Sequence, residues 1–101
     1  MAKIFKALSD PKRVQILDIL SGGETCACVL LEFFHISQPT LSHDMKLLID
    51  ADMVKGRRDG QRMLYSLNCE AIKKMQQKMI KMLQDGASSP ACREAQNGNI
   101  Q

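Results

Sequence analysis

The sequence predicts a mainly α-helical chain with one small β-hairpin. Three observations indicate this class. Two helical stretches follow each other closely before the middle of the chain, a strand-turn-strand pattern surrounds Asp59-Gly60, and an apolar stripe with helical spacing runs through residues 72–83. So few elements in this order suit one compact domain rather than two.

The first two predicted helices are separated by a cap and a proline. Residues 4–8 have helical apolar spacing, and Asp10-Pro11 then begins a second helix that runs to about Leu20, before Gly22-Gly23. One side of this second helix is expected to be buried, with Lys12 and Arg13 outside. The predicted buried positions are Val14, Ile16, Leu17 and Leu20.

The next two helices form a helix-turn-helix. A third helix is predicted over residues 26–34 with Thr25 as its N-cap, and Ser37 caps a fourth helix that reaches about Ile49. Pro39 is compatible with the first turn of that helix, where no intrahelical N–H bond is lost. The positions of the third helix predicted to face the core are Val29, Leu30 and Phe33. Two helices joined by a short turn are typical of DNA-binding proteins.

The apolar pattern then changes from helical to alternating. Residues 53–58 and 61–67 flank Asp59-Gly60, which is a strong signal for a two-residue turn between antiparallel strands. A hairpin directly after a helix-turn-helix is a wing, so the predicted architecture is a winged helix-turn-helix. Asn68 caps a last helix that reaches about Gln84.

The apolar stripe of the last helix is wide for so short a chain. Its members are Ile72, Met75, Met79 and either Met82 or Leu83. One interpretation packs this stripe against the domain's own core. The favoured interpretation is a homodimer in which the first and last helices pair across a twofold axis.

Composition indicates one domain and a tail. The chain has 101 residues, 45% of them hydrophobic and 4% aromatic, so an aliphatic core is expected. We assign residues 1–84 to a winged helix-turn-helix domain for DNA binding and dimerisation, and residues 85–101 to a flexible C-terminal tail. No stretch approaches the roughly 20 apolar residues of a membrane span. We therefore expect a cytoplasmic protein with no membrane partner, whose four cysteines are thiols or metal ligands rather than disulfides.

Positive charge is concentrated in residues 55–81, a stretch that contains eight basic residues and two acidic ones. This distribution favours double-stranded DNA as a partner. On the fourth helix, Gln38, Ser42 and His43 suit base edges and Lys46 suits phosphate. The basic residues of the hairpin that we expect at phosphates are Arg57, Arg58 and Arg62. An ordinary solvated helix face would look the same, and it is the adjacent basic hairpin that favours DNA.

Cys26 and Cys28 form a second candidate site, because closely spaced thiols suit a soft, thiophilic ion. On a regular helix a two-residue step turns by about 200°, so the two sulfurs would point to opposite sides. Capture of one ion by both should then bend or unwind this turn and weaken DNA binding. The helix N-terminus is expected to lower the pKa of both thiols. The alternative is that both cysteines are small core residues.

These segments together resemble the ArsR/SmtB family of bacterial repressors. The resemblance covers roughly residues 4–68 and rests on three stretches, Leu8–Leu17, Glu24–Cys28 and Ser37–His43. It is strongest to arsenical-resistance repressors with Cys-x-Cys at the third helix. The resemblance implies a homodimeric winged helix that binds an operator palindrome and releases it when arsenite or antimonite binds the cysteine thiolates, with no organic cofactor.

The chain departs from the family pattern near both sites. Val29 replaces an expected Asp, Leu31 occupies the position of a third cysteine found in some members, and Asp44 follows His43 where a second His is usual. We expect Asp44 to make an internal contact. Trivalent arsenic prefers three thiolates, and three sources of the third sulfur stay open: Cys92 in the tail, which we favour, Cys69, and a small thiol from solution.

Three alternative functions follow from the same residues. A redox-sensing repressor of the same fold would oxidise Cys26 and Cys28, or one of them with another cysteine, although two cysteines separated by one residue form a strained disulfide. A cysteine-dependent enzyme would need a base, for which His35 is the nearby candidate, and we do not expect an enzyme. A protein-interaction module would use the methionine-rich last helix and would not bind DNA.

Overall fold

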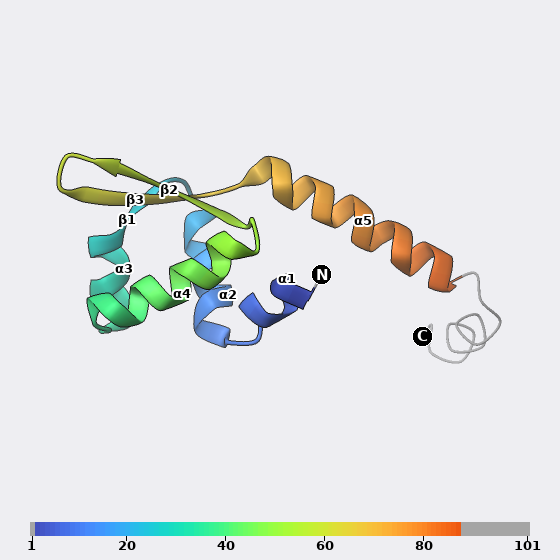
Figure 1. Cartoon of the computed structure of the whole chain (residues 1–101), viewed down its shortest axis with the longest axis horizontal. Helices are drawn as coiled ribbons and strands as arrows, with labels where there is room; N and C mark the ends of the chain where they lie inside the picture. The colour runs from blue at the N-terminus through green and yellow to red at the C-terminus, as the bar shows by residue number, and fades with distance from the viewer. Residues whose placement is uncertain (1, 88–101) are drawn as a thin grey trace.

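The computed structural model describes residues 2–87 and shows a helical body with a three-stranded sheet along one side (Figure 1). Four helices form the body and a fifth leaves it as an arm. The helices are α1 (Ala2–Ala7), α2 (Pro11–Leu20), α3 (Ala27–Phe34), α4 (Gln38–Asp50) and α5 (Cys69–Ala87). The strands are β1 (Thr25–Cys26), β2 (Val54–Asp59) and β3 (Arg62–Leu67), in the order β1-β3-β2. The predicted class, a helical domain with a small hairpin, is confirmed.

The predicted caps are present at the starts of α2 and α5. The Asp10 carboxylate accepts a hydrogen bond from the Lys12 backbone N–H at 2.9 Å, and Pro11 occupies the first turn of α2. The Asn68 side chain accepts from the Ala71 backbone N–H at 3.3 Å at the start of α5. Gly60 has φ +64° in the hairpin turn, a conformation that glycine adopts without strain. These local signals were sufficient to place α2, α5 and the hairpin.

The core lies between α2, α3, α4 and the inner face of the sheet. Its largest fully buried side chains are Ile16, Leu30, Leu41, Met45 and Leu48. Burial of Ile16, Leu20 and Leu30 confirms those predictions, and Leu17 is half-buried. Val14, Val29 and Phe33 were predicted inside but are 46%, 50% and 53% exposed, so those three predictions are wrong. In α3 the buried side instead passes through Ala27, Leu30, Leu31 and Phe34.

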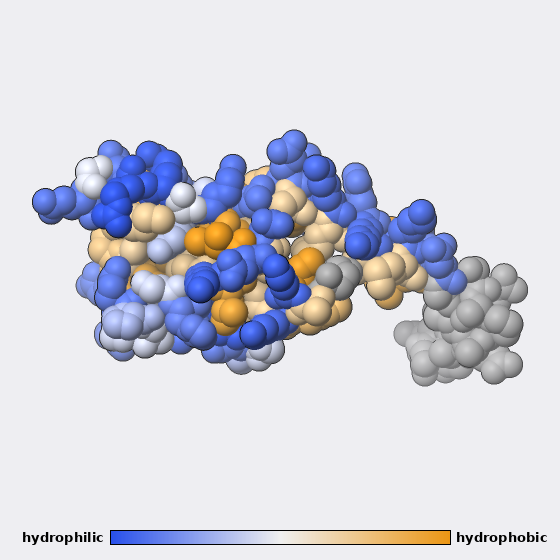
Figure 2. All heavy atoms as spheres, in the orientation of Figure 1, coloured by the Kyte–Doolittle hydropathy of each residue, from blue (hydrophilic) through white to orange (hydrophobic). Residues whose placement is uncertain are grey.

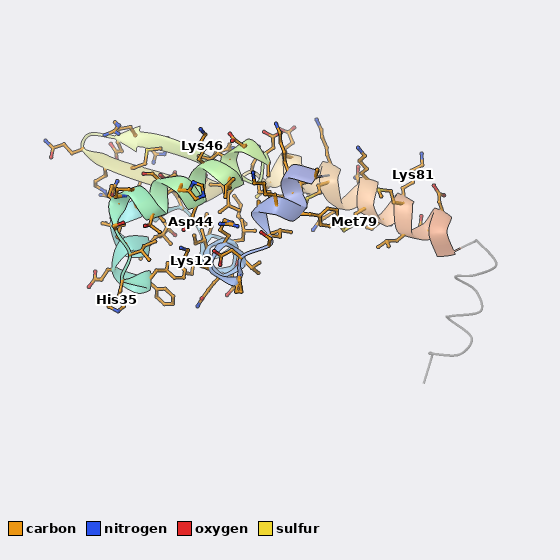
Figure 3. All side chains as sticks on the ribbon, turned by 60° about the horizontal axis from the view of Figure 1, so that its bottom comes forward. Lys12, His35, Asp44, Lys46, Met79 and Lys81 are labelled. Carbon is orange, nitrogen blue, oxygen red and sulfur yellow. The ribbon has the colours of Figure 1, made fainter. Side chains whose placement is uncertain are left out.

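The arm formed by α5 extends well beyond the body (Figure 1). It ends at Ala87, three residues past the predicted end, and the residues beyond it, including Cys92, lie outside the described part of the chain. Met75 packs against the core, whereas Ile80, Met82 and Leu83 are more than half exposed. Met79 and Lys81 point to different sides of the helix (Figure 3). Among residues 2–87, no helix is long and apolar enough to cross a membrane.

Candidate nucleic-acid interface and thiol site

The outer face of α4 presents the four side chains predicted for DNA. Ser37 caps the helix by accepting a hydrogen bond from the Thr40 backbone N–H at 3.4 Å. Leu41, Asp44, Met45 and Leu48 are buried on the inner face. The exposed residues include Gln38, Ser42, His43 and Lys46. The helix therefore carries polar hydrogen-bonding groups outside and an apolar anchor inside, as a recognition helix requires.

A buried charge cluster ties α4 to α2. Arg13 and Asp44 are 8% and 3% exposed, and Arg13 Nη1 donates a hydrogen bond to Asp44 Oδ1 at 3.0 Å. Lys12 Nζ lies 2.8 Å from Asp44 Oδ2 as an ion pair without hydrogen-bond geometry. Figure 3 shows Asp44 directed toward Lys12, with Lys46 on the other side of α4. The expected internal contact of Asp44 is confirmed.

The same cluster overturns the prediction that Arg13 lies outside. Its Nε donates to the Ala7 carbonyl at 2.7 Å and its Nη2 donates to the Lys6 carbonyl at 3.3 Å, both at the end of α1. Arg13 thus satisfies the carbonyls of one helix and the carboxylate of another, which is how a buried guanidinium avoids an unpaired charge. Lys12 is half-buried rather than fully outside. The cluster fixes α4 against α1 and α2.

The wing carries the predicted basic residues on an exposed hairpin. Residues of β2 and β3 pair in register from Val54 with Leu67 to Asp59 with Arg62, and hydrophilic side chains cover the hairpin tip (Figure 2). Arg57, Arg58 and Arg62 are exposed. Within residues 2–87, neither Arg58 nor Arg62 has a carboxylate within ion-pair distance. Both are therefore available to an anion.

Arg57 differs from its two neighbours because it pairs with Glu24. Its Nε and Nη2 donate to the two Glu24 carboxylate oxygens, each at 2.8 Å. This pairing lowers the pKa of Glu24, mainly through the hydrogen bond, and raises the pKa of Arg57. Glu24 was not singled out from the sequence, because nothing local indicates a partner so far along the chain. The pair joins the wing to the residue that precedes the first strand.

Cys26 lies at the edge of the sheet and caps α3. Its backbone is extended, at φ −71° and ψ 142°, and it pairs with Leu64 of β3. The Cys26 sulfur accepts a hydrogen bond from the Cys28 backbone N–H at 3.3 Å. The predicted N-cap, Thr25, is therefore wrong by one residue. The expectation that both cysteines sit on regular helix with opposed sulfurs is also wrong, because Cys26 precedes the first helical turn.

The two thiols differ in exposure and in acidity. Cys26 is buried and Cys28 is exposed. Hydrogen bonds from Cys28, first from its thiol and then from its backbone N–H, lower the pKa of Cys26, and Arg62 contributes in the same direction. The pKa of Cys28 is raised, first by its hydrogen bond to Cys26 and then by desolvation. The prediction that both pKa values fall holds for Cys26 alone. In this pair the pKa of Cys26 is lowered, because hydrogen bonds from Cys28 stabilise the Cys26 thiolate.

A groove of about 240 Å³ lies between the two thiols and the elements predicted to contact DNA. It lies where the start of α3, the first turn of α4 and the hairpin meet. Its polar lining comes from Cys26, Cys28, Gln38, Arg58, Gln61 and Arg62. The groove thus brings together two thiols and two cations that the sequence assigned to separate sites.

A third thiol is not present in this groove among the described residues. Within residues 2–87 there is no cluster of three His, Cys, Asp or Glu side chains that could hold a metal ion. Cys69 begins α5, beyond the end of β3, and at about 3.3 Å per strand residue it is on the order of 15 Å from the Cys26–Leu64 pairing. Cys92, the favoured third ligand, lies outside the described residues.

Comparisons with known proteins agree on one class. The family model described as "Bacterial regulatory protein, arsR family" matches residues 10–55. An arsenical resistance operon repressor from Staphylococcus xylosus is 44% identical over 97% of this chain and 93% of its own length. A repressor of the same name from Staphylococcus aureus is 56% identical over 67% of this chain and 65% of its own.

A solved structure shares the architecture as well. It is the homodimeric winged helix-turn-helix DNA-binding domain of a possible ArsR-family transcriptional regulator from Mycobacterium bovis. The similarity has a TM-score of 0.65 and 27% identity, and it covers 83% of this chain and 77% of that one. The fold predicted from the sequence, a winged helix-turn-helix, is confirmed by this match.

Proposed function

Because the chain belongs to the arsR family of bacterial regulatory proteins, we propose that it is a homodimeric repressor that releases operator DNA when arsenite or antimonite binds Cys26 and Cys28. The observation that carries the proposal is the groove in which both thiols lie beside Gln38 of α4 and Arg58 and Arg62 of the wing. A ligand bound there touches both elements that would contact DNA. Relatives named as arsenical resistance repressors support the choice of inducer.

The chemistry of the pair suits a soft ion. Sulfur is the preferred donor for trivalent arsenic and antimony, and the Cys26 thiol already has a lowered pKa. Because Cys26 precedes the helix, both sulfurs can bind one ion without unwinding α3 by a full turn. Binding instead replaces the hydrogen bond from Cys28 N–H to the Cys26 sulfur and shifts β1 against β3. That shift moves the wing and weakens operator binding.

DNA recognition is assigned to α4 and the wing. Gln38, Ser42 and His43 would read base edges in the major groove, and Lys46 would contact phosphate. Arg58 and Arg62 would add phosphate contacts from the wing. Arg57 contributes less, because its guanidinium is committed to Glu24.

This assignment predicts unequal salt effects for the wing arginines. Arg58→Ala and Arg62→Ala should each reduce the slope of log affinity against log salt by about one, and weaken binding on all sequences alike. Arg57→Ala should reduce this slope by clearly less than either of the other two substitutions. Operator titrations at several salt concentrations measure the slopes. Equal slopes for all variants and the native protein would remove the wing from the interface.

Dimerisation is assigned to α1 and α5. An apolar cleft of about 210 Å³ lies at their junction, with Ile4, Ala51, Met53, Ile72 and Met75 in its lining. Phe5 on α1 and Leu83 on α5 are 57% and 67% exposed. Burying these side chains needs a partner surface, and a second copy of the same two helices supplies one.

The dimer assignment predicts that charge on the apolar side of α5 separates the protomers. Leu83→Glu should shift the sedimentation coefficient toward the monomer, whereas Lys81→Glu, on a more polar side of the same helix, should not. Analytical ultracentrifugation at matched concentrations measures both. A dimer that persists equally in both variants contradicts the use of α5.

The inducer is tested on the intact protein bound to operator DNA. Arsenite, antimonite, zinc and peroxide are titrated separately in a gel-shift assay, with a phosphine reductant present in all but the peroxide series. Release by arsenite or antimonite under reductant is expected. Release by peroxide alone would favour the redox-sensing alternative, and failure to bind DNA at all would favour an interaction module.

The geometry does not support a cysteine-dependent enzyme. His35 caps the far end of α3 with a left-handed backbone, φ 53°, and it is exposed. The length of α3 separates it from the thiol pair by about 12 Å along the helix axis. Figure 3 shows His35 at the end of the helix away from the hairpin. It cannot act as a base for either cysteine in this arrangement.

A further inference from the structure

The wing forms part of the lining of the thiol groove. Arg58, Gln61 and Arg62 come from the hairpin, and Gln38 comes from the first turn of α4. No acidic residue is in the lining. The groove therefore combines two soft donors with two cations and two amides. Two thiols account for two of the three sulfurs that trivalent arsenic prefers, and nothing in the described lining supplies a third.

We propose that the third sulfur comes from a small thiol that carries carboxylate groups, held in this groove by Arg58 and Arg62. The inference rests on the proposed function, since it names the co-ligand of the same site. A guanidinium and a carboxylate form charge-assisted hydrogen bonds, and Arg58 and Arg62 have no carboxylate of the described chain within ion-pair distance. The volume of about 240 Å³ accommodates an arsenic atom with a thiol of a few carbon atoms.

The binding reaction is a condensation without redox change. Arsenous acid brings three hydroxyl groups, and each of the three thiols replaces one of them. Three As–O bonds break, three As–S bonds form, and every thiol proton leaves in a molecule of water. Arsenic stays trivalent throughout, so no oxidant or reductant is consumed.

The same contacts explain why a bound ligand opposes DNA binding. Arg58 and Arg62 are the wing cations assigned to phosphate. A carboxylate-bearing co-ligand competes with the DNA backbone for them, because one guanidinium cannot satisfy both anions fully. Release then follows from neutralising the wing as well as from moving it.

The test measures arsenite binding by the full reduced protein in the absence of DNA. Arsenite is titrated with mercaptosuccinate, mercaptoethanol or cysteamine present, which carry negative, neutral and positive groups. Binding is followed by As–S ultraviolet absorbance, and native mass spectrometry reports whether the thiol is retained. Mercaptosuccinate should lower the half-saturating arsenite concentration about five- to tenfold relative to mercaptoethanol, as expected for ion pairs at an exposed site. A ternary mass should appear.

Variants separate the groove from the intrinsic chemistry of the thiols. In Arg58→Gln the advantage of mercaptosuccinate over mercaptoethanol should shrink, whereas Lys55→Gln, the same charge change outside the groove lining, should keep it. An equal ratio in Arg58→Gln and native protein overturns the inference. The inference is also overturned if the bound arsenic retains no small-molecule thiol and Cys92→Ser abolishes arsenite binding. In that case the tail supplies the third sulfur. Absence of arsenite binding with every thiol would instead refute the proposed function.

Discussion

Replacing Asp44 with alanine is expected to lower the free energy of unfolding by about 3–5 kcal/mol, the usual cost of removing one partner from a buried ion pair. Arg13 would remain 8% exposed without its short contact to Asp44, and it would keep the longer ion pair with Asp10 (Nη1–Oδ2 3.6 Å) and its bonds to the Ala7 and Lys6 carbonyls. Urea denaturation at a fixed protomer concentration measures the loss, since a dimer's stability depends on concentration. Operator affinity should fall too, because α4 loses its tie to α2.

Two further variants make this result specific. Asp18 lies on the exposed side of α2, so Asp18→Ala removes a carboxylate without touching the cluster and should change stability by no more than about 0.5 kcal/mol. The double variant Arg13→Met with Asp44→Leu replaces both buried charges by apolar groups but removes the donor to the Ala7 carbonyl, so it should recover only part of the loss. Equal effects of Asp44→Ala and Asp18→Ala would show that the cluster contributes nothing to stability.

Local signals in the sequence were enough to place most elements. Proline and cap residues begin α2 and α4, and the Asp59-Gly60 turn sets the hairpin, because each depends on residues adjacent in the chain. The burial of α3 could not be assigned in the same way. Nearly every residue of this helix is apolar, so its pattern does not indicate which side faces the core.

The errors at the site come from contacts between distant segments. Strand β1 has two residues and forms through its pairing with β3, so no local sequence pattern predicts it. The Glu24–Arg57 and Arg13–Asp44 pairs likewise join residues more than thirty positions apart. Asp44 was expected inside because its position on the helical wheel borders the apolar face. The sequence predicted two separate candidate sites, and it did not predict that both thiols, Gln38, Arg58 and Arg62 line one groove.

Replacing Cys26 or Cys28 with serine is expected to weaken the response to arsenite strongly while leaving operator binding nearly intact. Serine keeps the size and hydrogen-bonding capacity of cysteine, so the cap at the start of α3 is retained. The hydroxyl does not replace a thiolate toward a soft ion. The arsenite concentration for half release should rise by about a hundredfold or more, above the roughly 10–100-fold cost of losing an outer-shell partner. Gel-shift titrations under a phosphine reductant measure it.

Cys69→Ser is the matched control, because Cys69 is an exposed thiol at the start of α5 that does not line the groove. It should respond to arsenite like the native protein. The two site variants should also behave alike despite their different exposure, since a shared ion needs the buried sulfur of Cys26 as much as the accessible one of Cys28. If Cys28→Ser lost the response and Cys26→Ser kept it, the ion would be bound by Cys28 with other donors, and movement of β1 could not be the cause of release.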